Sequence, residues 1–171
     1  MARVTALAGT LVFLVIAPGT VAGFVPWRMS AWRFQTPFWG WAGWRIAGGF
    51  LIVAGLLVLL ESFLRFALQG RGTPAPVLPT RQLVTAGLYR HVRNPMYLAV
   101  VSIIFGQALL FGHSGLLEYA AAVWIGFHMF IVFYEEPVLR RAYGVEYEGY
   151  CRDVHRWIPR GNLKIYSHLE L

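Results

Sequence analysis

Four apolar segments constrain the fold of this chain more than any other feature of its sequence. They cover about residues 4–25, 41–66, 97–112 and 115–134. A helix needs about 20 apolar residues to cross the hydrocarbon core of a bilayer, so the third segment must stand nearly upright or end below the far interface. Of the 171 residues, 57% are hydrophobic and 13% are charged, which is more apolar surface than a soluble domain of this length can bury. The sequence therefore predicts an all-α polytopic membrane protein with about four transmembrane helices.

The predicted membrane domain takes in residues 1–171 as a single unit. It divides into two N-terminal transmembrane helices, a loop, a helical hairpin and a C-terminal region, over 1–66, 67–96, 97–134 and 135–171, respectively. Residues 112–115 form a tight connector, which makes the third and fourth segments an antiparallel hairpin. In the C-terminal region apolar residues alternate loosely with charged ones, which predicts an amphipathic helical region on the cytoplasmic membrane surface.

The distribution of basic residues orients the chain in the membrane. The chain carries 15 Lys and Arg against 8 Asp and Glu, for a net charge of +7. Five arginines lie from Arg65 to Arg93 and six basic residues from Arg140 to Lys164, but none lies in the hairpin connector. Under the positive-inside rule this asymmetry places the loop, the C-terminal region and both termini in the cytoplasm. Because the cations flank apolar spans, membrane topology explains them, and nucleic-acid binding is not expected.

Ionisable residues gather at the predicted cytoplasmic ends of two spans. Basic residues occur within 90–93, before the third span, and Glu135 and Glu136 end the fourth. Such groups are costly enough at membrane depth to need a reason. A zwitterionic nucleoside such as S-adenosylmethionine suits them, because cations bind its carboxylate, carboxylates bind its ammonium and ribose, and aromatic side chains cover its adenine. From the residues alone, loop 81–97 and the two glutamates fit this ligand, another nucleotide, or simple contact with lipid headgroups.

A set of ordered motifs extends over residues 81–159. It consists of L-V-x-x-G-x-Y at 83–89, R-x-P-x-Y at 93–97, E-E-x-x-L at 135–139, Y-G-x-x-Y-x-x-Y at 143–150 and I-P at 158–159. In order and spacing, this set resembles the integral-membrane methyltransferases that include isoprenylcysteine carboxyl methyltransferase and the phospholipid methyltransferases. The resemblance covers nearly half of the chain and leaves out the first two spans.

The resemblance implies S-adenosylmethionine-dependent methyl transfer to a lipophilic or amphipathic acceptor at the cytoplasmic membrane interface. It also implies a cofactor site built from the loop and the C-terminal segment, with these residues: Arg81, Gln82, Leu83, Val84, Tyr89, Asn94, Pro95, Met96, Tyr97, Glu135 and Glu136. No catalytic residue is assigned, since direct in-line transfer depends chiefly on positioning and desolvation. If the acceptor has to lose a proton, the candidate bases are His91, His155, Glu136 and Tyr97.

Three positions depart from the family pattern. Asn94 stands where R-H-P-x-Y has a histidine, and Arg81 stands where eukaryotic members commonly have one. Asparagine donates and accepts hydrogen bonds but does not titrate near neutrality. Ile131 stands where eukaryotic isoprenylcysteine enzymes place a substrate-linked arginine, which disfavours a prenylcysteine carboxylate as the acceptor. The R-N-P-M-Y block is, by resemblance, more like prokaryotic members and favours a prokaryotic inner (cytoplasmic) membrane.

Two other functions stay open. A membrane reductase of related fold has a similar R-H-P-x-Y motif and binds NADPH, but the paired glutamates followed by Leu139 favour methyl transfer. A non-catalytic helical membrane protein predicts no cofactor affinity at all. No metal site is expected, because Cys151 is the one cysteine and His128 has no partner ligand one helical turn away. We expect His128 to be a hydrogen-bonded interior residue and Glu61 to pair with Arg65. The sequence does not indicate the oligomeric state.

Overall fold

The computed structural model describes residues 16–68 and 83–159, and every regular element within these ranges is helical. In chain order the elements are η1 (Thr20–Phe24), α2 (Val25–Ser30), η2 (Phe38–Gly40), α3 (Gly43–Leu68), η3 (Gly87–Arg90), α4 (Pro95–Phe111), α5 (Ser114–Phe130), η4 (Ile131–Glu135), α6 (Glu136–Tyr143) and α7 (Val145–Asp153). Of the elements marked η, η1 and η4 are π-helical, and η2 and η3 are 3₁₀ turns.

Two of these helices are long and apolar enough to cross a membrane. One is Gly43–Arg65 in α3, and the other is the continuous helix Ser114–Tyr143, which joins α5, η4 and α6. With 17 residues, α4 is a shorter apolar helix, as the short third segment predicts. These findings confirm the all-α class with apolar helices of spanning length, whereas the predicted first span, about 4–25, lies mostly outside the described residues.

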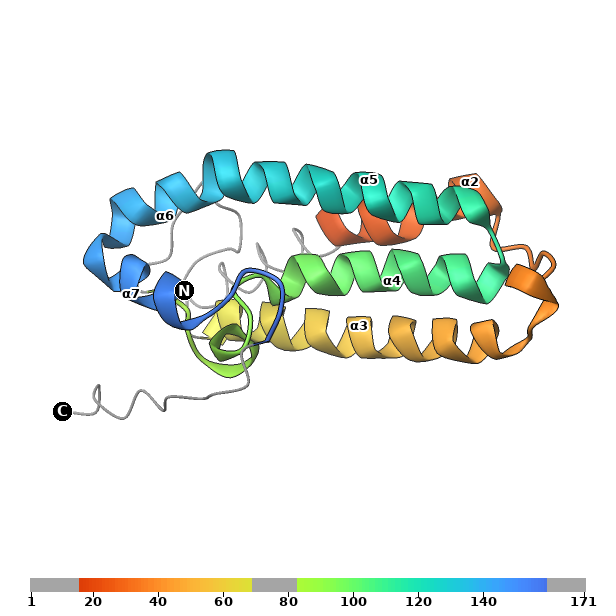
Figure 1. The fold of residues 1–171 in the computed structure, drawn as a ribbon, viewed down its shortest axis with the longest axis horizontal. Helices are drawn as coiled ribbons and strands as arrows, with labels where there is room; N and C mark the ends of the chain where they lie inside the picture. Colours follow the sequence, from red (N-terminus) through yellow and green to blue (C-terminus); the bar gives the residue numbers. More distant parts are fainter. Residues whose placement is uncertain (1–15, 69–82, 160–171) are drawn as a thin grey trace, which may run out of the picture.

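α3, α4 and α5 lie side by side in chain order (Figure 1). Only Gly112 and His113 connect α4 to α5, which forms a tight antiparallel hairpin. Where α3 crosses α4, a Cβ atom on Gly48 would lie 2.5 Å from the carbonyl oxygen of Gly106. Glycine at this crossing therefore lets the two helix backbones approach closely, as small residues do in membrane helix pairs.

A buried glutamine fastens the N-terminal helix to α4. Pro26 has no N–H to offer the carbonyl of Ala22 four residues earlier. The side-chain amide of Gln107, which is 6% exposed, donates to that carbonyl instead, at 2.7 Å. The indole N–H of Trp32 donates to the side-chain oxygen of Gln107 at 3.0 Å. Gln107 thus satisfies a backbone acceptor that the proline leaves without its usual partner.

The elements that carry the sequence motifs gather at the opposite end of the bundle from the α4–α5 connector. There α5 continues through η4 into α6, and α7 turns back beside η3 (Figure 1). Gly144, with a φ of +52°, separates α6 from α7. A glycine adopts this left-handed backbone conformation without the penalty that a Cβ atom imposes. The short chain after α7, residues 154–159, is called the C-terminal segment below.

Candidate functional site

The first motif block folds against α7. The side chain of Leu83 packs on a buried cluster of Tyr147, Tyr150 and Val154. The hydroxyl of Tyr150 donates a 2.6 Å hydrogen bond to the backbone carbonyl of Tyr89 in η3. Burial among these groups raises the pKa of the Tyr89 phenol well above its usual range, so this side chain stays neutral. The contact joins two motif blocks that lie far apart in the sequence.

Gly87 allows this block to approach α3. Its φ is +63°, and a Cβ atom there would collide with the side chains of Glu61 and Arg65. Glu61 and Arg65 form an ion pair one helical turn apart, which confirms the pairing expected from their spacing. The positive φ therefore favours glycine at this position of the L-V-x-x-G-x-Y motif, and a larger residue would also displace the ends of the Glu61 and Arg65 side chains.

The second motif block begins α4. Pro95 is the first residue of this helix, and Asn94 precedes it. A proline is tolerated there because an N–H at the first helical position has no acceptor within the helix. The Asn94 side-chain amide donates to the carbonyl of Arg156 at 3.2 Å, and the Arg93 N–H donates to the carbonyl of His155 at 2.9 Å. The start of α4 therefore holds the C-terminal segment in place. Asn94 is buried and acts here as a hydrogen-bond donor, a role that needs no titratable group.

Tyr97 and Glu135 meet across the space between α4 and η4. The Tyr97 hydroxyl donates a 2.8 Å hydrogen bond to Oε2 of Glu135, although the two residues are 38 positions apart. The Tyr97 ring also packs on Phe127 of α5, with ring centroids 4.7 Å apart. Glu135 is only partly buried. Its carboxylate is thus oriented by a tyrosine, in a residue that keeps part of its surface exposed.

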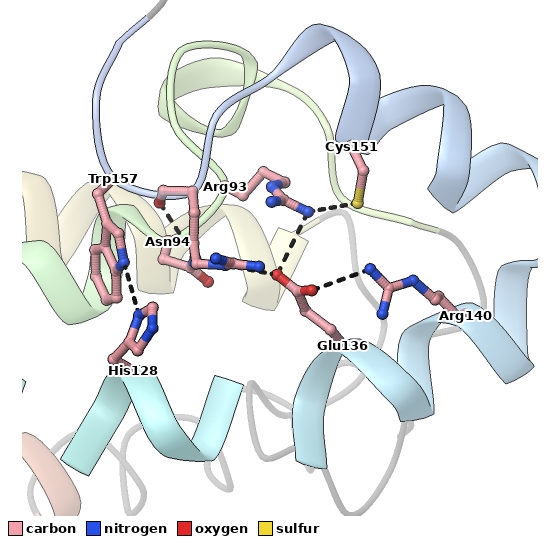
Figure 2. A network of polar contacts seen from close by, with 8 residues as sticks. Arg93, Asn94, His128, Glu136, Arg140, Cys151 and Trp157 are labelled. Carbon is pink, nitrogen blue, oxygen red and sulfur yellow. Dashed lines mark hydrogen bonds and ion pairs between the residues drawn. The ribbon is translucent and has the colours of Figure 1, made fainter. Parts of the chain in front are cut away.

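Glu136, the next residue, has a different environment. It is 3% exposed, and its Oε1 accepts from Arg156 Nε at 2.7 Å and lies 3.5 Å from Arg93 Nη1. Its Oε2 accepts from Arg140 Nη2 at 3.2 Å, and Arg93 also contacts the sulfur of Cys151 (Figure 2). The hydrogen bond to Glu136 raises the pKa of the Arg156 guanidinium, so the group stays charged. Both oxygens of Glu136 are therefore engaged by cations of the protein itself.

The Glu136 cluster joins three separate parts of the chain: the loop before α4, α6 and the C-terminal segment. The sequence does not predict this arrangement, because Arg156 and Glu136 are 20 positions apart and no local pattern pairs them. The one available signal was the excess of arginine around a glutamate at the end of an apolar span. A glutamate buried at that depth needs cationic partners.

His128 and Trp157 make a further link between α5 and the C-terminal segment. The indole N–H of Trp157 donates to Nδ1 of His128 at 3.2 Å, which confirms a hydrogen-bonded histidine on this helix (Figure 2). The ring centroid of Trp124 lies 5.8 Å from that of His128 and 6.0 Å from that of Trp157. Within 16–68 and 83–159, no group of three or more His, Cys, Asp or Glu side chains could hold a metal ion.

The remaining residues that were expected to bind the cofactor are only in part described by the structure. Arg81 and Gln82 lie outside the described residues. Val84 is partly buried in the stretch that leads to η3, and Met96 packs against the main hydrophobic core of the helical bundle. The groups that converge at this end are Leu83, Tyr89, Asn94, Pro95, Tyr97, Glu135 and Glu136. They supply two carboxylates with different partners, aromatic surface and hydrogen-bond donors.

Comparisons with known proteins agree with the motif set. The profile of the family described as phospholipid methyltransferase matches residues 44–146. Two curated proteins, from Oryza sativa subsp. indica and subsp. japonica, each carry the name probable protein-S-isoprenylcysteine O-methyltransferase. Each is 34% identical over 79 residues, which is 46% of this chain and 41% of the relative. The chain thus matches about two fifths of the length of these relatives.

No solved structure matches the chain significantly. The match to the family profile extends from the start of α3 to the start of α7 and covers more than half of the 171 residues. It includes the loop before α4, the α4–α5 hairpin and both glutamates. The chain therefore belongs to the phospholipid methyltransferase family.

Proposed function

We propose that this protein transfers a methyl group from S-adenosylmethionine to a lipophilic or amphipathic acceptor at the cytoplasmic face of the membrane. The observation that carries the proposal is the hydrogen bond from Tyr97 to Glu135, which unites two motif blocks of the family in one site. A carboxylate oriented in this way binds the ribose hydroxyls or the ammonium group of the cofactor.

The cofactor site extends from this pair along η3 and the start of α4. In the proposal, Glu135 and Tyr97 hold polar groups of S-adenosylmethionine, and Leu83, Val84, Tyr89 and Met96 form the surrounding wall. Arg81 and Gln82 complete the loop beside them. Asn94 and Glu136 shape the site by holding the C-terminal segment, as their contacts with Arg156 support, and Pro95 begins α4 beside them.

The proposed topology has four spans: the first apolar segment, α3, α4 and α5. The loop, α6, α7 and both termini face the cytoplasm, because basic residues concentrate there. α6 and α7 lie at the membrane surface, and a prokaryotic inner membrane suits the R-N-P-M-Y block. The cofactor then binds from the aqueous side while the acceptor's apolar part reaches the site sideways from the bilayer.

The chemical step in this proposal is direct transfer from the sulfonium to the acceptor. Holding the two reactants in line and removing water supplies most of the acceleration. The curated relatives are named for isoprenylcysteine, but the residue matching the arginine of the eukaryotic isoprenylcysteine enzymes, Ile131, is 1% exposed here. The proposal therefore favours an acceptor other than a prenylcysteine carboxylate.

A transfer assay with methyl-labelled S-adenosylmethionine tests this function. Purified protein in lipid vesicles is given a panel of phospholipid, prenylated-thiol and amine acceptors, and label is counted in the organic phase. We expect label with at least one acceptor, reduced by Glu135→Gln and unaffected by Glu118→Gln, a matched control at an exposed glutamate on α5. Label from no acceptor, or equal label from both variants, contradicts the proposal.

A further inference from the structure

The helix that carries both glutamates contains one wide turn. In η4 the N–H of Glu136 donates to the carbonyl of Ile131, five residues earlier, where an α-helix would use the residue four earlier. A π-helical turn of this kind accommodates about one additional residue within an otherwise α-helical run. Side chains beyond the turn are therefore rotated by about 100° from where an uninterrupted α-helix would put them.

The contacts of Tyr97 depend on this additional residue. Tyr97 packs on Phe127 and donates to Glu135, so two residues eight positions apart on one helix reach the same side chain. In an uninterrupted α-helix a residue eight positions on lies about 80° around the axis, whereas one seven positions on lies within about 20°. Because the wide turn takes up one residue, Glu135 lies where the seventh residue after Phe127 would lie in a regular α-helix. Glu135 is therefore on the helix face that carries Phe127.

A second pair of residues shows the same spacing. His128 accepts from Trp157, and Glu136, eight positions later, binds Arg156, the neighbour of that tryptophan. The C-terminal segment therefore meets one face of the helix at both points, before and after the turn. The contacts of both glutamates thus depend on the same rotation of the helix at the wide turn, although the two residues have different partners.

Pro137 explains why the turn is wide at this place. A proline in a helix has no N–H for the carbonyl four residues earlier and its ring clashes with that carbonyl. The chain contains a second case, in which the π-helical η1 is followed by Pro26 in the same relation. There Val25, the residue before the proline, donates to the carbonyl of Thr20, as Glu136 does to Ile131. Two prolines with the same local hydrogen-bond shift indicate a common cause.

We propose that Pro137 is a positioning residue of the site: through the wide turn it imposes, it sets the register that aims Glu135 at Tyr97 and Glu136 at Arg93 and Arg156. This inference rests on the proposed function for its consequence in cofactor binding. Pro137 touches neither reactant in this account. Its effect is transmitted through the rotation of the helix alone.

Compensating variants test the register directly. Pro137→Ala restores the missing N–H and allows a regular helix, which moves both glutamates off their partners. Deletion of Phe133, whose side chain is 71% exposed, removes one residue from the turn and shifts the register in the opposite sense while Pro137 is still present. The two changes together give a regular helix with the original register. Pro26→Ala, after the other π-helical turn, is the matched control.

The first measurement is equilibrium binding of S-adenosylhomocysteine. Each single change weakens binding about tenfold or more, as expected for loss of a charged hydrogen-bonding group. The combined variant binds within about threefold of wild type, because the two shifts cancel, and Pro26→Ala leaves binding unchanged. Wild-type affinity in Pro137→Ala, or no recovery in the combined variant, overturns the inference.

Thermal unfolding of the same variants separates this inference from the proposed function. If the wild type binds no S-adenosylhomocysteine, the proposed function fails, but the register still governs the contacts of Glu136. Each single change then lowers the unfolding temperature and the combination restores it. Single changes that leave the unfolding temperature unchanged, or a combination that lowers it further, overturn the register account independently of any cofactor.

Discussion

Replacing Glu136 with alanine tests whether this residue stabilises the fold, whereas Glu135 binds the cofactor. The side chain is 4% exposed and is the shared partner of three arginines. Of these, Arg93 is 11% exposed, whereas Arg156 and Arg140 are 30% and 48% exposed. Removing the carboxylate therefore leaves Arg93 as a buried cation without its counter-ion, while water compensates the other two in part.

The magnitude follows from that burial. Breaking a buried ion pair by removing one partner costs about 3–5 kcal/mol, because the remaining charge stays desolvated. The more exposed pairs add about 0–1 kcal/mol each, since solvent screens them. We expect Glu136→Ala to lower the free energy of unfolding by about 3–7 kcal/mol in total, most of it from the loss of the Arg93 pair. Glu136→Gln, which keeps an acceptor for Arg156, loses less.

Thermal and denaturant unfolding in detergent measure this effect, and limited proteolysis reports release of the C-terminal segment. Glu135→Gln serves as the comparison, because its neighbour Tyr97 is neutral and no cation is left unpaired. We expect it to change stability little while weakening cofactor binding. An unchanged unfolding free energy in Glu136→Ala, or a larger loss in Glu135→Gln, refutes the assignment of Glu136 to structure.

Two further predictions concern the helical bundle. Gly106→Ala puts a Cβ atom 2.7 Å from a carbonyl oxygen of α3 and should lower the unfolding temperature, whereas Gly126→Ala, with no atom within 4 Å, should leave it unchanged or raise it. Gln107→Leu removes the donor to the Ala22 carbonyl and should cost about 1–3 kcal/mol of unfolding free energy, measured by the same denaturant titration. Equal unfolding temperatures for the two glycine variants, or an unchanged stability in Gln107→Leu, would contradict these readings of the packing.

Some of this fold follows directly from the sequence. The apolar segment 41–66 corresponds to α3, and the short segment 97–112 corresponds to α4, which begins two residues earlier at Pro95. The reason is that spanning helices are recognised by length and composition alone. The pairing of Glu61 with Arg65 follows from helical spacing in the same way.

Other features depend on tertiary contacts that no local pattern specifies. Glu135 and Glu136 are adjacent glutamates in the sequence, and only the tertiary structure shows that the first meets Tyr97 and the second meets Arg156. Pro137 was a usable signal for a wide turn, because a proline within a helical run removes the N–H that the carbonyl four residues earlier would otherwise use. Gln107 gave no signal, since its partner is a carbonyl 85 residues away.

Equilibrium binding of S-adenosylhomocysteine to the detergent-purified protein tests the central claim most directly, with NADPH measured beside it. The account predicts saturable binding of S-adenosylhomocysteine that Glu135→Gln weakens and Glu118→Gln does not, and no competition by NADPH. Binding of NADPH alone would identify a reductase. A folded protein that binds neither ligand would contradict the methyltransferase account and leave a membrane protein without this cofactor chemistry.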